Sequence, residues 1–175
     1  MKRLLITIVT VVALVASFAT PVFAVDPITI AMSAQIVAIT NTQDTWTIGA
    51  VEAGDPAITW GASDTYSTVE NTGNVAVDVE IQGSDAEGGD YDWTLANTGD
   101  AGNKIFTLFA NSDHSTTYNI RVKSTGYNDL CTDLAATGSD TWTWSMQLTP
   151  PTIFDVADTG GNKEATVTLV ASKHI

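Results

Sequence analysis

The segment 75–82 is the part of this sequence that most constrains the fold. β-branched side chains alternate there with alanine, acidic or amide side chains; the β-branched residues are Val75, Val77, Val79 and Ile81. Because successive side chains of a strand point to opposite faces, the alternation predicts a strand with one buried face and one wet face. The Asn and Gly residues of segment 71–74 tolerate tight turns, so we expect segments 68–71 and 75–82 to form an antiparallel hairpin.

Similar short alternating segments recur along the chain, separated by Gly, Asn, Asp and Pro. They cover residues 28–36, 46–50, 58–60, 93–95, 106–108, 118–122, 142–148 and 165–171. Leu130 and Leu134 are spaced as in one helical turn. About nine short strands with turn residues between them predict an all-β fold with little helix, an antiparallel two-sheet β-sandwich of the immunoglobulin-like or jelly-roll kind.

Residues 1–24 have the composition of a cleaved signal peptide. Lys2 and Arg3 precede an uncharged apolar run, and Val22 and Ala24 stand at the two positions that signal peptidase reads. An uncleaved membrane anchor is the alternative, but the run is shorter than the roughly 20 residues of a membrane span. We therefore expect residues 25–175 to form a single domain, secreted or held at the cell surface, with no membrane segment after cleavage.

Charge and cysteine content narrow the partners. The chain has 20 acidic residues against 7 Lys and Arg, a net charge of −13 at pH 7. Nucleic-acid binding needs clustered cations, so this composition argues against it. Cys131 is the only cysteine, which excludes an internal disulfide. We expect Cys131 to be a small buried hydrophobe, with an intermolecular disulfide as the alternative.

The sequence carries no catalytic motif that we recognise. His114 and His174 have no second His or Cys at ligand spacing, and there is neither a nucleophile elbow nor a phosphate loop. We therefore expect a non-enzymatic protein that requires no cofactor. Calcium is the one metal that the sequence favours, because it binds carboxylates on flexible, glycine-containing loops. The candidate calcium loop contains Asp85, Glu87, Asp90 and Asp92; a solvated acidic turn is the alternative.

Five tryptophans lie in or near the alternating segments. Core packing is the default expectation for most of them. Trp142 and Trp144 fall on the same face of one predicted strand, so they are also candidates for stacking against a glycan. This feature, together with the acidic loops, makes polysaccharide a second expected partner.

Several segments resemble known surface proteins. Residues 69–77 resemble a hairpin of secreted immunoglobulin-like sandwiches from bacterial and archaeal surfaces, and residues 142–152 and 165–171 are similar to their last strands. The order of signal peptide, immediate strand and jelly-roll-like body resembles the TasA group of biofilm fibre subunits. Trp93-Thr94-Leu95 resembles the Trp-x-Leu motif of cell-wall-binding WxL domains. These resemblances imply a structural role outside the cell.

We therefore expect a subunit of an extracellular filament, pilus-like fibre or surface coat whose main partner is another copy of itself. Signal cleavage would free a chain end just before five alternating apolar residues, Ile28, Ile30, Met32, Ala34 and Ile36. An extended segment of this kind can complete the sheet of a neighbour, which would propagate a fibre. The alternatives are that the segment is the first strand of its own sandwich, and that the protein is a polysaccharide- or cell-wall-binding module.

Overall fold

A computed structural model describes residues 33–43, 45–60, 66–111, 115–136, 140–154 and 161–175. The chain divides into two units, Met1–Ser33 and Ala34–Ile175. The account below concerns the second unit. The predicted signal peptide and three residues of the predicted assembly strand, Ile28, Ile30 and Met32, lie outside the described residues.

The second unit is all-β, as predicted, and its described residues contain no helix. Accordingly, no described segment is a long apolar helix that could span a bilayer. The eleven strands are β1 (Ile39–Asn41), β2 (Ile58–Thr59), β3 (Ser67–Asn71), β4 (Val77–Gly83), β5 (Thr94–Leu95), β6 (Ile105–Asn111), β7 (Tyr118–Arg121), β8 (Asn128–Leu134), β9 (Thr141–Trp144), β10 (Met146–Thr149) and β11 (Val167–Lys173).

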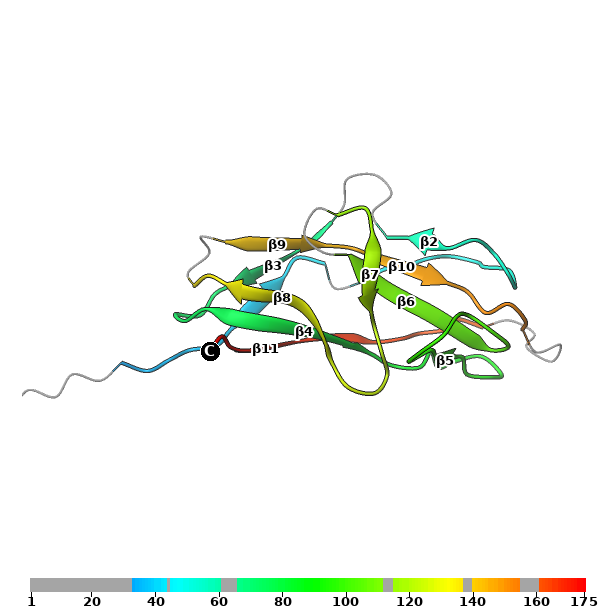
Figure 1. The fold of residues 1–175 in the computed structure, drawn as a ribbon. Coiled ribbons are helices and arrows are strands. Elements are labelled where there is room, and N and C mark those ends of the chain that lie inside the picture. Colours follow the sequence, from blue (N-terminus) through cyan, green and yellow to red (C-terminus); the bar gives the residue numbers. More distant parts are fainter. Residues whose placement is uncertain (1–32, 44, 61–65, 112–114, 137–139, 155–160) are drawn as a thin grey trace, which may run out of the picture. The chain divides into compact units, whose positions relative to one another are not determined.

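The strands form three sheets, where the sequence predicted two (Figure 1). The first has the order β1-β3-β9, and the third has the order β11-β4-β8. The second has the order β2-β10-β6-β5, with β7 also paired to β6. All pairs are antiparallel except β5 with β6, which is parallel.

All three sheets contribute side chains to one hydrophobic core, which is the arrangement of a β-sandwich. The alternation predicted for β4 is confirmed, since Val77, Val79 and Ile81 are fully buried. Phe106 from the second sheet and Trp144 from the first are also buried. Cys131 on β8 lies in the same core and forms no disulfide, so its predicted burial is confirmed.

The predicted hairpin of residues 68–71 and 75–82 is wrong, although both strands exist. β3 pairs with β1 and β9, whereas β4 pairs with β11 and β8. Residues 72–76 therefore carry the chain from one sheet to another, and we call them the β3–β4 arch. The cause is Asn71, which is fully buried and donates to the backbone oxygens of Val75 and Leu134 instead of facing solvent in a turn.

The predicted helical turn at residues 130–134 is also wrong, because these residues belong to β8. Between Val77 and Val79 of β4, the paired residue on β8 moves from Leu134 to Cys131, so β8 carries one extra residue. This is a β-bulge, and Asp133 takes the left-handed backbone conformation there, with φ of 57°. The bulge sets the buried residues Cys131 and Leu134 three apart instead of two, a spacing that also occurs on one face of a helix.

Two further strand predictions need correction. The segment 142–148 forms two strands, because the chain passes from the first sheet to the second at Ser145. Ser145 is fully buried; its N–H donates to Asn111 Oδ1 at 2.6 Å, and its hydroxyl lies 2.9 Å from that of Tyr118. The segment 46–50 forms no strand, nor do residues 34–38, the described end of the predicted assembly strand.

Candidate functional site

The edge of β11 is the first candidate site. Within the described ranges, β11 pairs with β4 alone. The backbone bonds Ser84 N to Thr166 O and His174 N to Ala76 O show that even-numbered residues face β4. Peptide groups alternate in direction along an antiparallel strand, so those of residues 167, 169, 171 and 173 point away from β4.

The side chains along this edge are apolar and only half-buried. Val167, Leu169 and Ala171 pack against the core but keep part of their surface exposed. No charged residue or proline occurs in β11 before Lys173. The edge therefore combines outward backbone hydrogen-bonding groups with incompletely covered apolar side chains.

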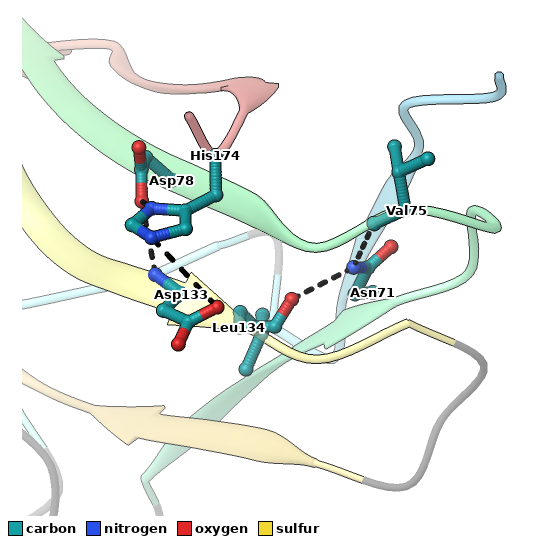
Figure 2. Close-up of polar contacts among 6 residues, drawn as sticks. All are labelled: Asn71, Val75, Asp78, Asp133, Leu134 and His174. Atoms are coloured by element: carbon teal, nitrogen blue, oxygen red, sulfur yellow. Dashed lines mark hydrogen bonds and ion pairs between the residues drawn. The ribbon is translucent and has the colours of Figure 1, made fainter.

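A cluster of ionisable side chains fixes the end of β11 (Figure 2). His174 Nδ1 lies 2.7 Å from Asp78 Oδ1 on β4, and the backbone N–H of Asp133 on β8 donates to the same oxygen at 2.9 Å. His174 Nε2 lies 3.9 Å from Asp133 Oδ1. The Asp133 N–H, and after it His174, hold the pKa of Asp78 below its usual value of 3.8. The cluster ties the three strands of the third sheet together.

The β3–β4 arch lies beside this cluster (Figure 2). Asn71 Nδ2 donates to Val75 O at 2.8 Å and to Leu134 O at 2.9 Å, and Asn71 Oδ1 accepts from Gly73 N at 2.9 Å. A single buried amide therefore satisfies three backbone groups from the arch and β8. These bonds fix the arch at the end of the third sheet where β11 finishes, since Val77 at the start of β4 pairs with Lys173.

The segment before β1 rests on the same arch. Ile36 and Asn74 exchange hydrogen bonds, from Ile36 N to Asn74 Oδ1 at 2.7 Å and from Asn74 N to Ile36 O at 3.0 Å. Ala34 and Ile36, the two described members of the predicted assembly strand, are both exposed. In Figure 1 this segment, in light blue, leaves the strands on the side where the C-terminus lies.

The predicted calcium loop does not gather its carboxylates. Asp85 Oδ1 accepts from the N–H of Leu95 at 2.8 Å, and Glu87 is joined to Glu164 through backbone bonds. Asp90 and Asp92 are exposed. Within the described residues, no group of three or more acidic, His or Cys side chains is placed to hold a metal ion.

A cation from the protein itself already contacts this loop. Lys163 Nζ donates to the backbone oxygens of Gly88 and Tyr91, and it lies 5.8 Å from the centre of the Trp93 ring. The ammonium group therefore uses carbonyl oxygens that a calcium ion would need.

The tryptophans that were candidates for glycan stacking lie in different environments. Trp144 is 2% exposed, and its Nε1 donates to Asn41 Oδ1 at 3.1 Å. Trp142 is half-buried. Trp46 and Trp60, both half-buried, stack on each other with ring centres 6.1 Å apart, and Trp60 packs edge-on against Trp144. Trp144 therefore packs in the core, and the partly exposed indoles are Trp142, Trp46 and Trp60.

Sequence reasoning found the strand that forms the edge but missed the groups that fix it. Asp78 and His174 are 96 positions apart, and Asn71 and Leu134 are 63 apart, so no local pattern connects them. The signal in the sequence was a single acidic residue on the wet side of an alternating strand, which resembles any solvated residue. No protein-family model matches this chain, and none of the curated proteins searched matches it either.

Proposed function

We propose that this protein is a non-enzymatic structural subunit of an extracellular fibre or surface coat, in which copies of the chain bind one another. The observation that carries the proposal is the unpaired edge of β11 within the described residues. The sequence supports it through the predicted signal peptide and the resemblance to the TasA group of fibre subunits.

The composition of the β11 edge favours a partner strand. Natural proteins protect the edges of their sheets with charged residues, prolines, bulges or short strands, because an open edge pairs with other chains. β11 has seven residues and no charge or proline before Lys173. An uncharged edge of this length would promote aggregation unless a specific partner covers it.

The partner we propose is segment 28–36 of a second copy. This segment has five apolar residues at every second position, which matches the spacing of the half-buried side chains Val167, Leu169 and Ala171. Ile36 stays bonded to Asn74 of its own domain, so the residues before it would form the main-chain hydrogen bonds along the edge and bury apolar surface from both strands. Because the donor segment and the acceptor edge are different surfaces, the contact is head-to-tail, and it extends into a filament when the rotation between copies does not close a ring.

A proline at one position of β11 tests the interface without removing it. The N–H of Ala171 points away from β4, so Ala171→Pro should leave the third sheet intact, as prolines are tolerated where the N–H faces outward at an edge. The variant should remain folded by circular dichroism and form no filaments by electron microscopy. Filaments of normal length and number from a folded Ala171→Pro protein would rule out the β11 edge.

The matched control is Val170→Pro, whose N–H faces β4. This change should destabilise the domain by about 3 kcal/mol, because it removes a hydrogen bond within the sheet. A domain that tolerates Val170→Pro better than Ala171→Pro would show that the assigned direction of the peptide groups is wrong.

Deletion of residues 25–32 tests the donor segment. If a neighbour receives this segment, the truncated protein should stay folded and monomeric, and a synthetic peptide of residues 25–36 should bind to it. If the segment belongs to its own sandwich, the truncated protein should unfold in a thermal melt, and added peptide should not restore filaments.

A further inference from the structure

An open polar groove lies on the domain where β7 ends and β8 begins. Its volume is about 610 Å³. The residues that matter for its chemistry are Asn97, Asn119, Arg121, Lys123, Asn128 and Asp129. They come from the loop after β5, from β7 and the residues following it, and from the start of β8. Three separate stretches of chain therefore line one groove.

Hydrogen bonds between these stretches hold the groove in a fixed shape. Asn97 Oδ1 accepts from the backbone N–H groups of Ser124 and Thr125 at 2.9 and 3.1 Å. Asn128 Nδ2 donates to Arg121 O, and Lys123 Nζ donates to Asn128 Oδ1 at 3.3 Å. A ligand would meet walls that are already ordered, which lowers the entropy lost on binding.

Arg121 also belongs to this framework. Its two terminal nitrogens donate to Ala96 O at 3.3 Å and Gly99 O at 2.7 Å, and its guanidinium lies 4.5 Å from the centre of the Phe109 ring. Arg121 thus supplies a fixed positive charge at the groove. Lys123 is better placed to contact a ligand directly, because an ammonium has three N–H groups and Asn128 accepts only one of them.

The groove carries two cationic side chains in an otherwise acidic chain. Among the described residues, the groove is lined by two cations, Arg121 and Lys123, and by one acid, Asp129; Glu80 on β4 pairs with Asp129, and Asp100 follows the lining residue Gly99. Because acids lie beside both cations, a carboxylate would be held by direct contact with Lys123, next to the fixed charge of Arg121, and not by a net positive field.

We infer that this groove binds a carboxylated saccharide, such as a unit of a uronic-acid polymer. The Lys123 ammonium and the Arg121 charge suit the carboxylate. The amide of Asn119 can donate to and accept from ring hydroxyls, and the carboxylate of Asp129 can accept from them. This inference is independent of the assembly proposed above, because the groove involves neither β11 nor segment 28–36.

Isothermal titration calorimetry with polygalacturonate provides the test, with neutral dextran in parallel. The wild-type protein should bind polygalacturonate but not dextran. Lys123→Gln should weaken binding about tenfold, the effect of losing one charge-assisted hydrogen bond. Asn119→Ala should weaken it less. Lys173→Gln, the same change of charge outside the groove, should leave binding within about twofold.

Each alternative outcome has a definite meaning. Absence of polygalacturonate binding by a folded wild-type protein would overturn the inference. Equal binding of dextran would show that the carboxylate is not recognised. Equal losses in the Lys123 and Lys173 variants would place binding elsewhere on the surface. Thermal melts of all three variants guard against misreading an unfolded protein as a loss of binding.

Discussion

Asp78 accepts hydrogen bonds from Asp133 N and from the His174 side chain at the end of β4. These contacts lower its pKa below 3.8, so its ionised form is favoured more in the folded protein than in the unfolded chain. The stabilisation is complete above pH 3.8 and is lost as the pH falls through the lowered value.

We therefore expect Asp78→Asn to lower the Tm near neutral pH and to lower it less as the pH falls below 3.8. Thermal melts between pH 2.5 and pH 7 would measure this, with Asp129→Asn as the control at an exposed aspartate. From the alternating pattern of β4 alone, Asp78→Asn would be expected to leave the Tm unchanged. A Tm difference that stays constant over the whole range would contradict the role of the Asp78 charge.

Among substitutions in and next to the β3–β4 arch, we expect Asn71→Ala to lower the free energy of unfolding most. Asn71→Ala removes both donors to Val75 O and Leu134 O and the acceptor of Gly73 N. Leaving such buried groups unpaired should lower the free energy of unfolding by about 2–3 kcal/mol. Chemical denaturation measures it, and Thr72→Ala, at an exposed arch position, should change it by less than about 0.5 kcal/mol. Equal effects at the two positions would show that the Asn71 amide is not essential.

At the scale of elements, the loop of residues 83–92 is where calcium remains a proposal. Lys163 Nζ contacts two of the loop's carbonyl oxygens, so a calcium ion would have to displace it. We expect millimolar calcium to raise the Tm of Lys163→Met more than that of the wild type. A ligand at a hundredfold excess over its Kd stabilises by about 2.7 kcal/mol. Magnesium and chelator are the controls, and an unchanged Tm for both proteins would exclude calcium.

The sequence predicted elements well where burial alternates, and less well where the chain changes sheet. Val77, Val79 and Ile81 identified β4 because one face of that strand is buried along its whole length. The pairing partners of β4 were missed, because β3 and β4 belong to different sheets. The sequence does not reveal that Asn71, which resembles a turn residue, is buried between them. The bulge at Asp133 changes the spacing of the buried side chains Cys131 and Leu134 from two to three, and the four-residue spacing of Leu130 and Leu134 fits a strand as well as a helical turn.

The candidate site was predictable only in part. The last strand could be located from the alternation of Val167, Leu169 and Ala171, but an alternating pattern does not say whether a strand is central or at an edge. The groove residues could not be grouped at all, because Asn97 meets Ser124 and Thr125 across 27 and 28 positions of chain. Polar residues on separate loops carry no periodicity that would link them.

For the whole molecule, charge sets how readily copies meet. The net charge of −13 makes copies repel one another at long range, and cleavage of the predicted signal peptide would make it more negative. Added salt screens this repulsion, with the Debye length falling from about 30 Å at 0.01 M to about 10 Å at 0.1 M. We expect filaments to form faster over this range, as followed by light scattering. Sucrose at equal osmolality is the control; slower assembly in salt would oppose the model.

The pairing of β4 with β11 has a consequence for how the chain folds. Val77 pairs with Lys173, so the partner of an early strand is among the last residues in the sequence. Contacts between such distant residues make folding slow, on the order of milliseconds to seconds for sandwich domains. During that time β4 would lack its β11 neighbour and could pair with other chains. The step that completes the third sheet also creates the β11 edge, so in the proposed assembly a copy would accept a neighbour only after its own fold is finished.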